Sequence, residues 1–136
     1  MSFLLVDDDF IFRTIAVRQI ELFGITQQVL QADNGQHAVE LLSGLKSDEL
    51  PEAILLDLNM PIMNGWDFLE SISSSSLKAT LKNIPIWIVT SSINPEDIEK
   101  SKTFSMVRGF LNKPLKEEDL TRIKKSARTT IYSWQE

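Results

Sequence analysis

Residues 53–61, with the sequence AILLDLNMP, decide the fold of this chain, because a short apolar run ends there in a single acid, Asp57. Turn-forming residues follow soon after, among them Asn64 and Gly65. A run that is apolar throughout, without alternation, predicts a strand in a sheet that is covered on both faces. Ligands bind at the carboxyl ends of the strands in open parallel sheets. Asp57 is therefore the first candidate site residue.

Three further apolar runs also end in polar residues that could bind or react. They are residues 3–6 before the acids Asp7, Asp8 and Asp9, residues 86–89 before Thr90, and residues 109–112 before Lys113 and Pro114. Because parallel strands bring their carboxyl ends to one edge, we expect acids, a hydroxyl and an ammonium group to meet there.

Short apolar runs alternate with longer amphipathic stretches along the chain, which is the pattern of βαβ units. We predict strands near 3–7, 27–32, 53–57, 85–90 and 107–111, and helices near 10–23, 35–45, 65–75, 95–104 and 116–133. Crossovers between parallel strands are right-handed. The predicted fold class is therefore α/β, a doubly wound five-stranded parallel sheet with helices on both faces. No linker or repeat interrupts it, so a single domain over residues 1–136 is expected.

Two stretches between the predicted elements are expected to be surface loops, Leu45–Glu52 and Ser73–Asn83. The serines that open the second stretch are interpreted as the frayed end of the third predicted helix. The last predicted helix carries apolar residues at three- and four-residue steps, the spacing of one buried face. These residues are Leu120, Ile123, Ala127, Ile131 and Trp134.

Composition narrows the class of protein. A chain of 136 residues that is 43% hydrophobic fits one globular domain. The net charge of -5 argues against a nucleic-acid binder, which needs a basic face, and the basic residues of the last helix are interpreted as a solvated face or a partner contact. The absence of cysteine excludes disulfides and thiolate metal sites. The N-terminus has no leader or long apolar segment, so we expect no membrane contact and a cytoplasmic location.

Crowded carboxylates predict a cation at the sheet edge. Two unit negative charges ~4 Å apart repel by roughly 4 kcal/mol near a protein surface. A hard divalent cation offsets that repulsion, and oxygen ligands suit Mg²⁺, which keeps several waters and leaves room for a phosphoryl oxygen. Asp7, Asp8 and Asp57 are the candidate acids. Formation of an acyl phosphate needs a nucleophilic oxygen and compensation for the charge on the phosphoryl oxygens. Asp57 supplies the nucleophile, and the Lys113 ammonium and the Thr90 hydroxyl supply the compensation together with the cation.

Each of these residues also has a simpler interpretation. Asp7 and its neighbours could form a turn and a helix cap, Thr90 could merely end a strand, and Lys113 could lie in a solvated turn. Their occurrence together, at strand ends that a doubly wound sheet brings to one edge, favours a site. Asp9 is an additional acid, either at the mouth of the site or, as we favour, the cap of the first helix.

The combined pattern resembles the response-regulator receiver domain of two-component signalling, over essentially the whole chain. The resemblance rests on LVDD at residues 5–8, LDLNMP at 56–61, VTS at 89–91 and the Lys113-Pro114 pair. It implies a flavodoxin-like receiver fold. Because no output domain follows, the chain looks like a stand-alone receiver of the chemotaxis (CheY-like) type.

The resemblance also implies a set of roles. Asp57 would accept a phosphoryl group from a phosphohistidine of a sensor histidine kinase or a histidine phosphotransfer protein. Asp8 and Asp57 would bind Mg²⁺ directly, Asn59 through its backbone carbonyl, and Asp7 through water. Lys113 would pair with the phosphoryl group.

Further implied roles concern the switch. Thr90 would move to hydrogen-bond the phosphoryl group, while Phe110, where the family often has tyrosine, would turn inward. The surface that a downstream protein reads would be the predicted helix at 95–104 with the strand at 107–111 and the helix at 116–133. The Lys113-Pro114 bond is usually cis in this family. No enzymatic activity is expected beyond the chain's own phosphorylation and dephosphorylation.

Two other functions compete with this interpretation. A Mg²⁺-dependent phosphatase of the haloacid-dehalogenase type would use the Asp-x-Asp spacing of Asp7 and Asp9, but it would leave Asp57 without a role. A receiver that works as an inert interaction module would have lost an acid or the lysine, and this chain has kept all of them. The only histidine, His37, is expected to be an exposed helix residue far from the acidic edge.

Overall fold

The computed structural model describes residues 1–132, with the side chains of the last helix described as far as Ala127. The elements follow in the order β1 (Ser2–Val6), α1 (Phe10–Leu22), β2 (Gln28–Ala32), α2 (Gly35–Gly44), the 3-10 turn η1 (Ser47–Glu49), β3 (Ala53–Leu56), α3 (Gly65–Ser73), α4 (Leu77–Leu81), β4 (Ile86–Thr90), α5 (Pro95–Ser101), β5 (Val107–Asn112) and α6 (Glu117–Tyr132).

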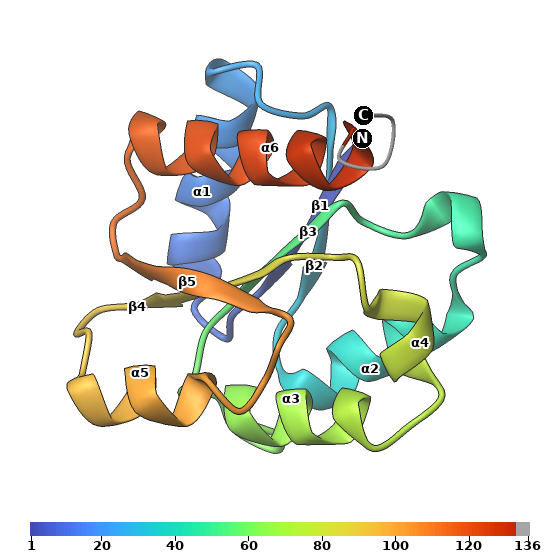
Figure 1. Ribbon diagram of the computed structural model, residues 1–136. Coiled ribbons are helices and arrows are strands. Elements are labelled where there is room, and N and C mark those ends of the chain that lie inside the picture. The colour runs from blue at the N-terminus through green and yellow to red at the C-terminus, as the bar shows by residue number, and fades with distance from the viewer. Residues whose placement is uncertain (133–136) are drawn as a thin grey trace.

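The five strands form one parallel sheet in the order β2-β1-β3-β4-β5, and Figure 1 shows this sheet between two groups of helices. The predicted α/β fold with a doubly wound parallel sheet is confirmed. The three central strands are buried along their whole length, whereas β2 and β5 at the edges are partly exposed. The order changes direction between β1 and β3, and a crevice at such a point is where α/β sheets bind ligands.

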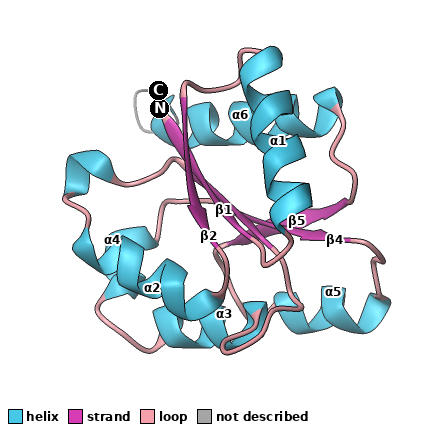
Figure 2. Ribbon diagram, turned by 180° about the vertical axis from the view of Figure 1, so that it is seen from behind, coloured by secondary structure: helices cyan, strands magenta, loops and turns pink. Residues whose placement is uncertain are grey.

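Alternate residues of the central strands feed two hydrophobic cores, one on each face of the sheet. Leu4, Ile54 and Ile88 face the core under α2, α3 and α4, which we call the α2–α4 core. Phe3, Leu55 and Val89 face the core under α1 and α6, which we call the α1–α6 core. Figure 2 shows these helices on opposite sides of the sheet. The sheet is therefore covered on both faces, as runs that are apolar throughout require.

Short polar side chains cap the helices that follow strand ends. Asp9 accepts from the backbone N–H groups of the first turn of α1, and Asn34, Asn64 and Asn94 do the same for α2, α3 and α5. These caps satisfy N–H groups that have no partner within the helix. The capped helices α1, α2 and α5 begin within a few residues of a strand end, whereas a longer loop joins Leu56 of β3 to Gly65 of α3.

The prediction of a surface loop over Ser73–Asn83 is wrong in part. The stretch contains the short helix α4, with Leu81 buried and Leu77 half-buried against the α2–α4 core. These two leucines are four residues apart and therefore share one helix face, a signal that the serine run obscured. The Leu45–Glu52 stretch likewise contains η1, and its Leu45 and Leu50 pack against the same core.

The last helix buries Leu120, Ile123 and Ala127, as its spacing predicted. The predicted burial of Ile131 and Trp134 concerns side chains outside the part that the structure describes. Within the described residues, none of the helices combines the length and the apolar character that a membrane span requires.

Candidate functional site

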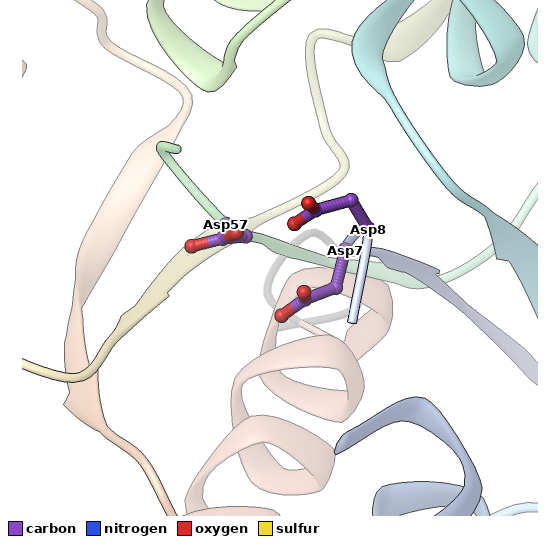
Figure 3. A group of neighbouring side chains, drawn as sticks. All are labelled: Asp7, Asp8 and Asp57. Carbon is purple, nitrogen blue, oxygen red and sulfur yellow. The ribbon is translucent and has the colours of Figure 1, made fainter. Parts of the chain in front are cut away.

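Three carboxylates meet at the carboxyl edge of the sheet. Asp7 and Asp8 directly follow β1, and Asp57 directly follows β3, its hydrogen-bonded neighbour. One oxygen of each lies within 4.8 Å of the others, and Figure 3 shows the three side chains turned toward a common space. Asp7 and Asp57 are buried, at 1% and 7% exposure, while Asp8 is exposed. The site is thus open to solvent on the Asp8 side.

The Lys113 ammonium crosses the edge to reach these acids. Lys113 directly follows β5, and its Nζ lies 2.7 Å from Asp7 Oδ2 and 3.7 Å from Asp57 Oδ1. Its backbone N–H donates to the carbonyl of Thr90 at 2.8 Å, and the bond to Pro114 is cis, as the resemblance implied. The ammonium therefore offsets part of the negative charge that the carboxylates bring together.

The Thr90 hydroxyl is engaged with the loop that follows β4. Thr90 Oγ1 donates to the carbonyl of Ser92 and accepts from its N–H, both at 3.3 Å. The side chain is buried at 6% exposure. Phe110 lies one strand away on β5, half-buried against the α2–α4 core. A hydroxyl held by two long hydrogen bonds can exchange them for a better acceptor at small cost.

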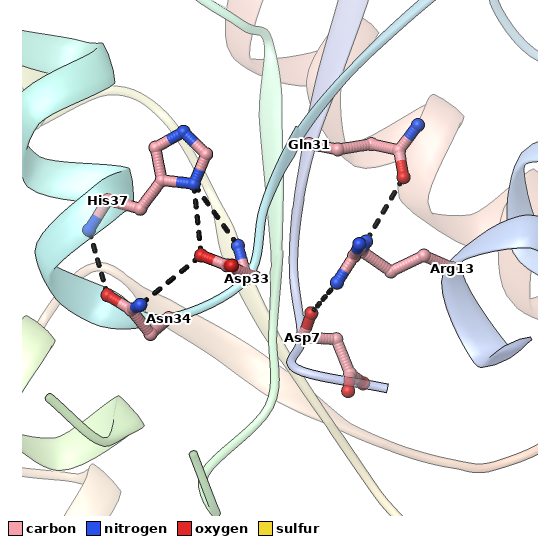
Figure 4. A network of polar contacts seen from close by, with 6 residues as sticks. All are labelled: Asp7, Arg13, Gln31, Asp33, Asn34 and His37. Carbon is pink, nitrogen blue, oxygen red and sulfur yellow. Dashed lines mark hydrogen bonds and ion pairs between the residues drawn. The ribbon is translucent and has the colours of Figure 1, made fainter. Parts of the chain in front are cut away.

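Asp7 is fixed by contacts that the sequence analysis did not find. Arg13 of α1 donates through Nη1 to the carbonyl of Asp7 and through Nε to Gln31 Oε1 of β2, as Figure 4 shows. Asp7 Oδ1 accepts from the N–H of Asp9 at 2.9 Å. An arginine four residues into the helix after a row of acids was the available signal. Its partner could have been the carboxylates as well as the carbonyl, so the sequence did not identify the contact.

Asp9 caps α1, accepting from the N–H groups of Ile11 and Phe12 at 3.0 and 3.1 Å. Its carboxylate is not part of the acid cluster. The favoured of its two interpretations, the cap, is confirmed. His37 is exposed, as expected, and it is not a member of the acid cluster. Its Nδ1 lies 3.1 Å from Asp33 Oδ1 (Figure 4).

The loop after Asp57 turns sharply to bring α3 back under the site. Ile62 has a positive φ of 68°, and the N–H of Met63 donates to the carbonyl of Pro61 at 2.7 Å, which forms a γ-turn around Ile62. The N–H of Gly65 then donates to the carbonyl of Leu58 at 3.0 Å. The loop is therefore tied to the strand end that carries Asp57. Asn59 lies on this loop with its side chain exposed.

The pKa of Asp57 is raised from 3.8 to about 6. Burial is the main cause, and the nearby charge of Asp7 adds to it, with a smaller contribution from Asp8. Lys113 and a hydrogen bond from the Asn59 backbone act in the opposite direction. The raised pKa means that burial and the neighbouring acids disfavour the negative charge of Asp57. A bound cation or a covalent bond to the carboxylate would compensate for that charge.

We predict that Asp57→Asn stabilises the metal-free protein at neutral pH by about 2–3 kcal/mol. Between the unfolded pKa of 3.8 and the folded pKa of about 6, the folded chain keeps a proton that the unfolded chain has lost. Wild-type stability therefore falls as the pH rises through this window. The gain of the variant is expected to be small near pH ~4 and full above pH ~6.

Chemical denaturation of wild type and Asp57→Asn in a chelator, at several pH values across that window, measures this gap. Asp9→Asn serves as the control, because it removes a neighbouring acid that lies outside the cluster, and asparagine is as good a cap as aspartate. A gap between wild type and Asp57→Asn that stays constant with pH would contradict the assignment.

The donors at this edge fit a hard divalent cation. They are carboxylate oxygens, and one of them, the buried Asp7 Oδ2, accepts no hydrogen bond of good geometry among the described residues although Lys113 Nζ is near. A buried oxygen with unused lone pairs, beside one exposed and one buried acid, suits an ion that keeps part of its water shell. Mg²⁺ is such an ion.

The fold and this edge define a doubly wound α/β domain with a cluster of acids at its topological switch point, where such sheets bind ligands. The family model of the response regulator receiver domain matches residues 3–125. The chain belongs to this family, and it is a receiver domain of the kind that two-component systems use.

Relatives and solved structures agree with the family. The chain is 32% identical over 122 residues to the sensor histidine kinase CheAY of Helicobacter pylori, covering 90% of the chain but 14% of the kinase. It is 30% identical over 135 residues to the probable methanogenesis regulatory protein FilR2 of Methanothrix harundinacea, covering 96% and 83%. A two-component response regulator from Cytophaga hutchinsonii has the same fold, with a TM-score of 0.87, 24% identity, and coverage of 94% and 96%.

Proposed function

We propose that this chain is a phosphorylation-gated switch in which Asp57 accepts a phosphoryl group from a phosphohistidine. The observation that carries the proposal is the convergence of Asp57 with Asp7 and Asp8, within 4.8 Å, and with the Lys113 ammonium at 3.7 Å. Membership in the receiver family supports it. The donor would be a sensor histidine kinase or a histidine phosphotransfer protein.

The transfer would form one bond and break one. An oxygen of the ionised Asp57 attacks the phosphorus, the bond from phosphorus to the donor's imidazole nitrogen breaks, and that nitrogen keeps the electron pair and takes up a proton. Mg²⁺ bound by Asp8, Asp57 and the carbonyl of Asn59, with Asp7 holding it through water, would supply charge compensation for the phosphoryl oxygens. Lys113 then moves from Asp7 toward the phosphoryl group.

The switch would follow from the strong hydrogen-bond acceptors that a phosphoryl group on Asp57 presents to its neighbours. Its oxygens are better acceptors than the Ser92 carbonyl, which the Thr90 hydroxyl contacts at 3.3 Å. Thr90 would therefore turn toward Asp57, and Phe110 on the neighbouring strand would move further into the core. The altered surface would comprise α5, β5 and α6, which a downstream protein reads. The result is a shift between two populated conformers.

The haloacid-dehalogenase alternative finds no support at the site. Asp9, the second acid of that motif, points its carboxylate at the N-terminus of α1 and lies outside the acid cluster. The inert-module alternative would need a lost acid or a lost lysine, and Asp7, Asp8, Asp57 and Lys113 are all present. We further propose a single receiver domain over residues 1–136, a cytoplasmic location, and no enzymatic activity beyond the chain's own phosphorylation and dephosphorylation.

Incubation with Mg²⁺ and acetyl phosphate tests the function directly. We expect intact-protein mass spectrometry to show one added phosphoryl group, stable in acid and removed by hydroxylamine, as acyl phosphates are. A chelator is expected to slow its appearance at least ten-fold, because roughly 1.4 kcal/mol of lost charge stabilisation has that effect. Folded protein that gains no phosphoryl group with Mg²⁺ present would refute the proposal.

A further inference from the structure

The ammonium group of Lys113 has an aromatic neighbour that the roles above do not use. Lys113 Nζ lies 4.5 Å from the centroid of the Phe12 ring, over its face. The same nitrogen is 2.7 Å from Asp7 Oδ2 and 3.7 Å from Asp57 Oδ1. The Lys113 side chain is only 19% exposed. An aromatic face attracts a cation through its quadrupole, and it does so more strongly where water is excluded.

Local structure fixes the Phe12 ring in this place. The Asp9 cap accepts from the N–H of Phe12 at 3.1 Å and so sets the first turn of α1. The ring is half-buried and packs against the α1–α6 core. Because the backbone of Phe12 is hydrogen-bonded and its side chain packs against the core, the ring has limited freedom to move away from Lys113.

Lys113 is attached at the edge of the sheet, far from the acids that its ammonium group contacts. It follows β5, at the edge of the sheet, and β4 and β3 lie between β5 and the strand that carries Asp7. A lysine side chain that spans this distance gives up much rotamer freedom. Asp7 is its nearer partner and would hold it away from Asp57 if nothing opposed that. The face of the Phe12 ring is a third contact of the ammonium, beside the two carboxylates.

We propose that Phe12 is a positioning residue, whose ring holds the Lys113 ammonium between Asp7 and Asp57, where it can meet the incoming phosphoryl group. The inference rests on the proposed function, because the benefit is felt at Asp57. Loss of the ring lets the ammonium move further from Asp57, onto Asp7 alone or into solvent, which slows phosphoryl transfer without removing any group that touches the phosphorus.

The first test measures the contact without any phosphorylation. Because Lys113 Nζ lies over the ring face, the protons of the adjoining ε-methylene are expected to resonate upfield of ordinary lysine positions in NMR spectra. Their loss in Lys113→Met identifies them. Phe12→Leu is expected to return them to ordinary positions. Phe23→Leu is the matched control: it makes the same change at the other end of α1, in a half-buried ring packed against the same core. Ordinary positions in wild type would overturn the proposal.

The second test measures the rate of phosphorylation by acetyl phosphate with Mg²⁺. Phe12→Leu is expected to slow phosphorylation by about 3- to 10-fold relative to wild type. Phe12→Tyr, which keeps an aromatic face, is expected to react at the wild-type rate, and so is Phe23→Leu. Fluorinated phenylalanines at position 12 keep the ring's shape but weaken its negative face, so the rate should fall stepwise with each added fluorine. A flat fluorine series would overturn the proposal, since packing alone would survive fluorination.

A double-mutant cycle shows whether Phe12 acts through the lysine. In a Lys113→Met background, Phe12→Leu is expected to cause no further slowing, because the cation that the ring holds is gone. The same slowing in both backgrounds would refute the positioning role. If wild type takes up no phosphoryl group, the proposed function fails, and the NMR test still decides the contact. If wild type reacts and Phe12→Leu reacts equally fast, only the positioning role fails.

Discussion

Asp57→Asn is expected to abolish phosphoryl incorporation completely, the largest effect that any single substitution should have on this chain. Asparagine keeps the shape of the side chain but has no nucleophilic carboxylate, so no acyl phosphate can form there. The variant should also fold well, because it removes one of the two buried acids at the edge. Mass spectrometry after incubation with acetyl phosphate and Mg²⁺ measures the loss.

Asp9→Asn is the matched control for this loss. The amide still caps α1, so the helix should keep its place, and incorporation is expected at the wild-type level. The pair of variants also separates the competing chemistry. A phosphatase of the haloacid-dehalogenase type would form its aspartyl phosphate on Asp7 and would survive the change at Asp57. Incorporation retained in Asp57→Asn would therefore exclude Asp57 as the acceptor.

Gly65→Ala is expected to destabilise the fold by about 3 kcal/mol. A Cβ at this position would lie 2.5 Å from the carbonyl oxygen of Asp57 and 2.9 Å from Leu58 Cα, both backbone atoms that cannot turn aside. The start of α3 would have to move away from β3, and Asp57 with it. Chemical denaturation measures the stability, and slower phosphorylation of the remaining folded protein is expected as well.

Gly44→Ala makes the same change where space is free. No atom lies within 4 Å of a Cβ built at this last residue of α2. Its stability is expected to stay level or rise by up to about 1 kcal/mol, because alanine favours the helix. Equal losses in Gly44→Ala and Gly65→Ala would show that the close approach of α3 to Asp57 is not what requires glycine.

Much of the fold follows from local pattern. Strand positions could be predicted because buried strands are short, apolar and bounded by turn residues, and right-handed crossovers then place helices on the faces of a parallel sheet. The strand order β2-β1-β3-β4-β5 came only from the structure. The acids, Thr90 and Lys113 could be assigned to one edge because parallel strands bring their carboxyl ends to it. By contrast, α4 was missed because it is a short helix of 5 residues after a run of serines, and the packing of Leu77 and Leu81 against the core helps to hold it in helical form.

The sequence by itself determined which groups gather at the site, because in a parallel sheet the position of a residue at a strand end fixes the edge at which it lies. The tertiary structure alone decided how these groups are held. Lys113 is a long side chain with many rotamers, and its place between Asp7 and Asp57 depends on the Phe12 ring of a helix far away in sequence. Arg13 could have bound a carboxylate, but its helix brings it to the carbonyl of Asp7. Such contacts depend on distances between elements, which local sequence pattern does not encode.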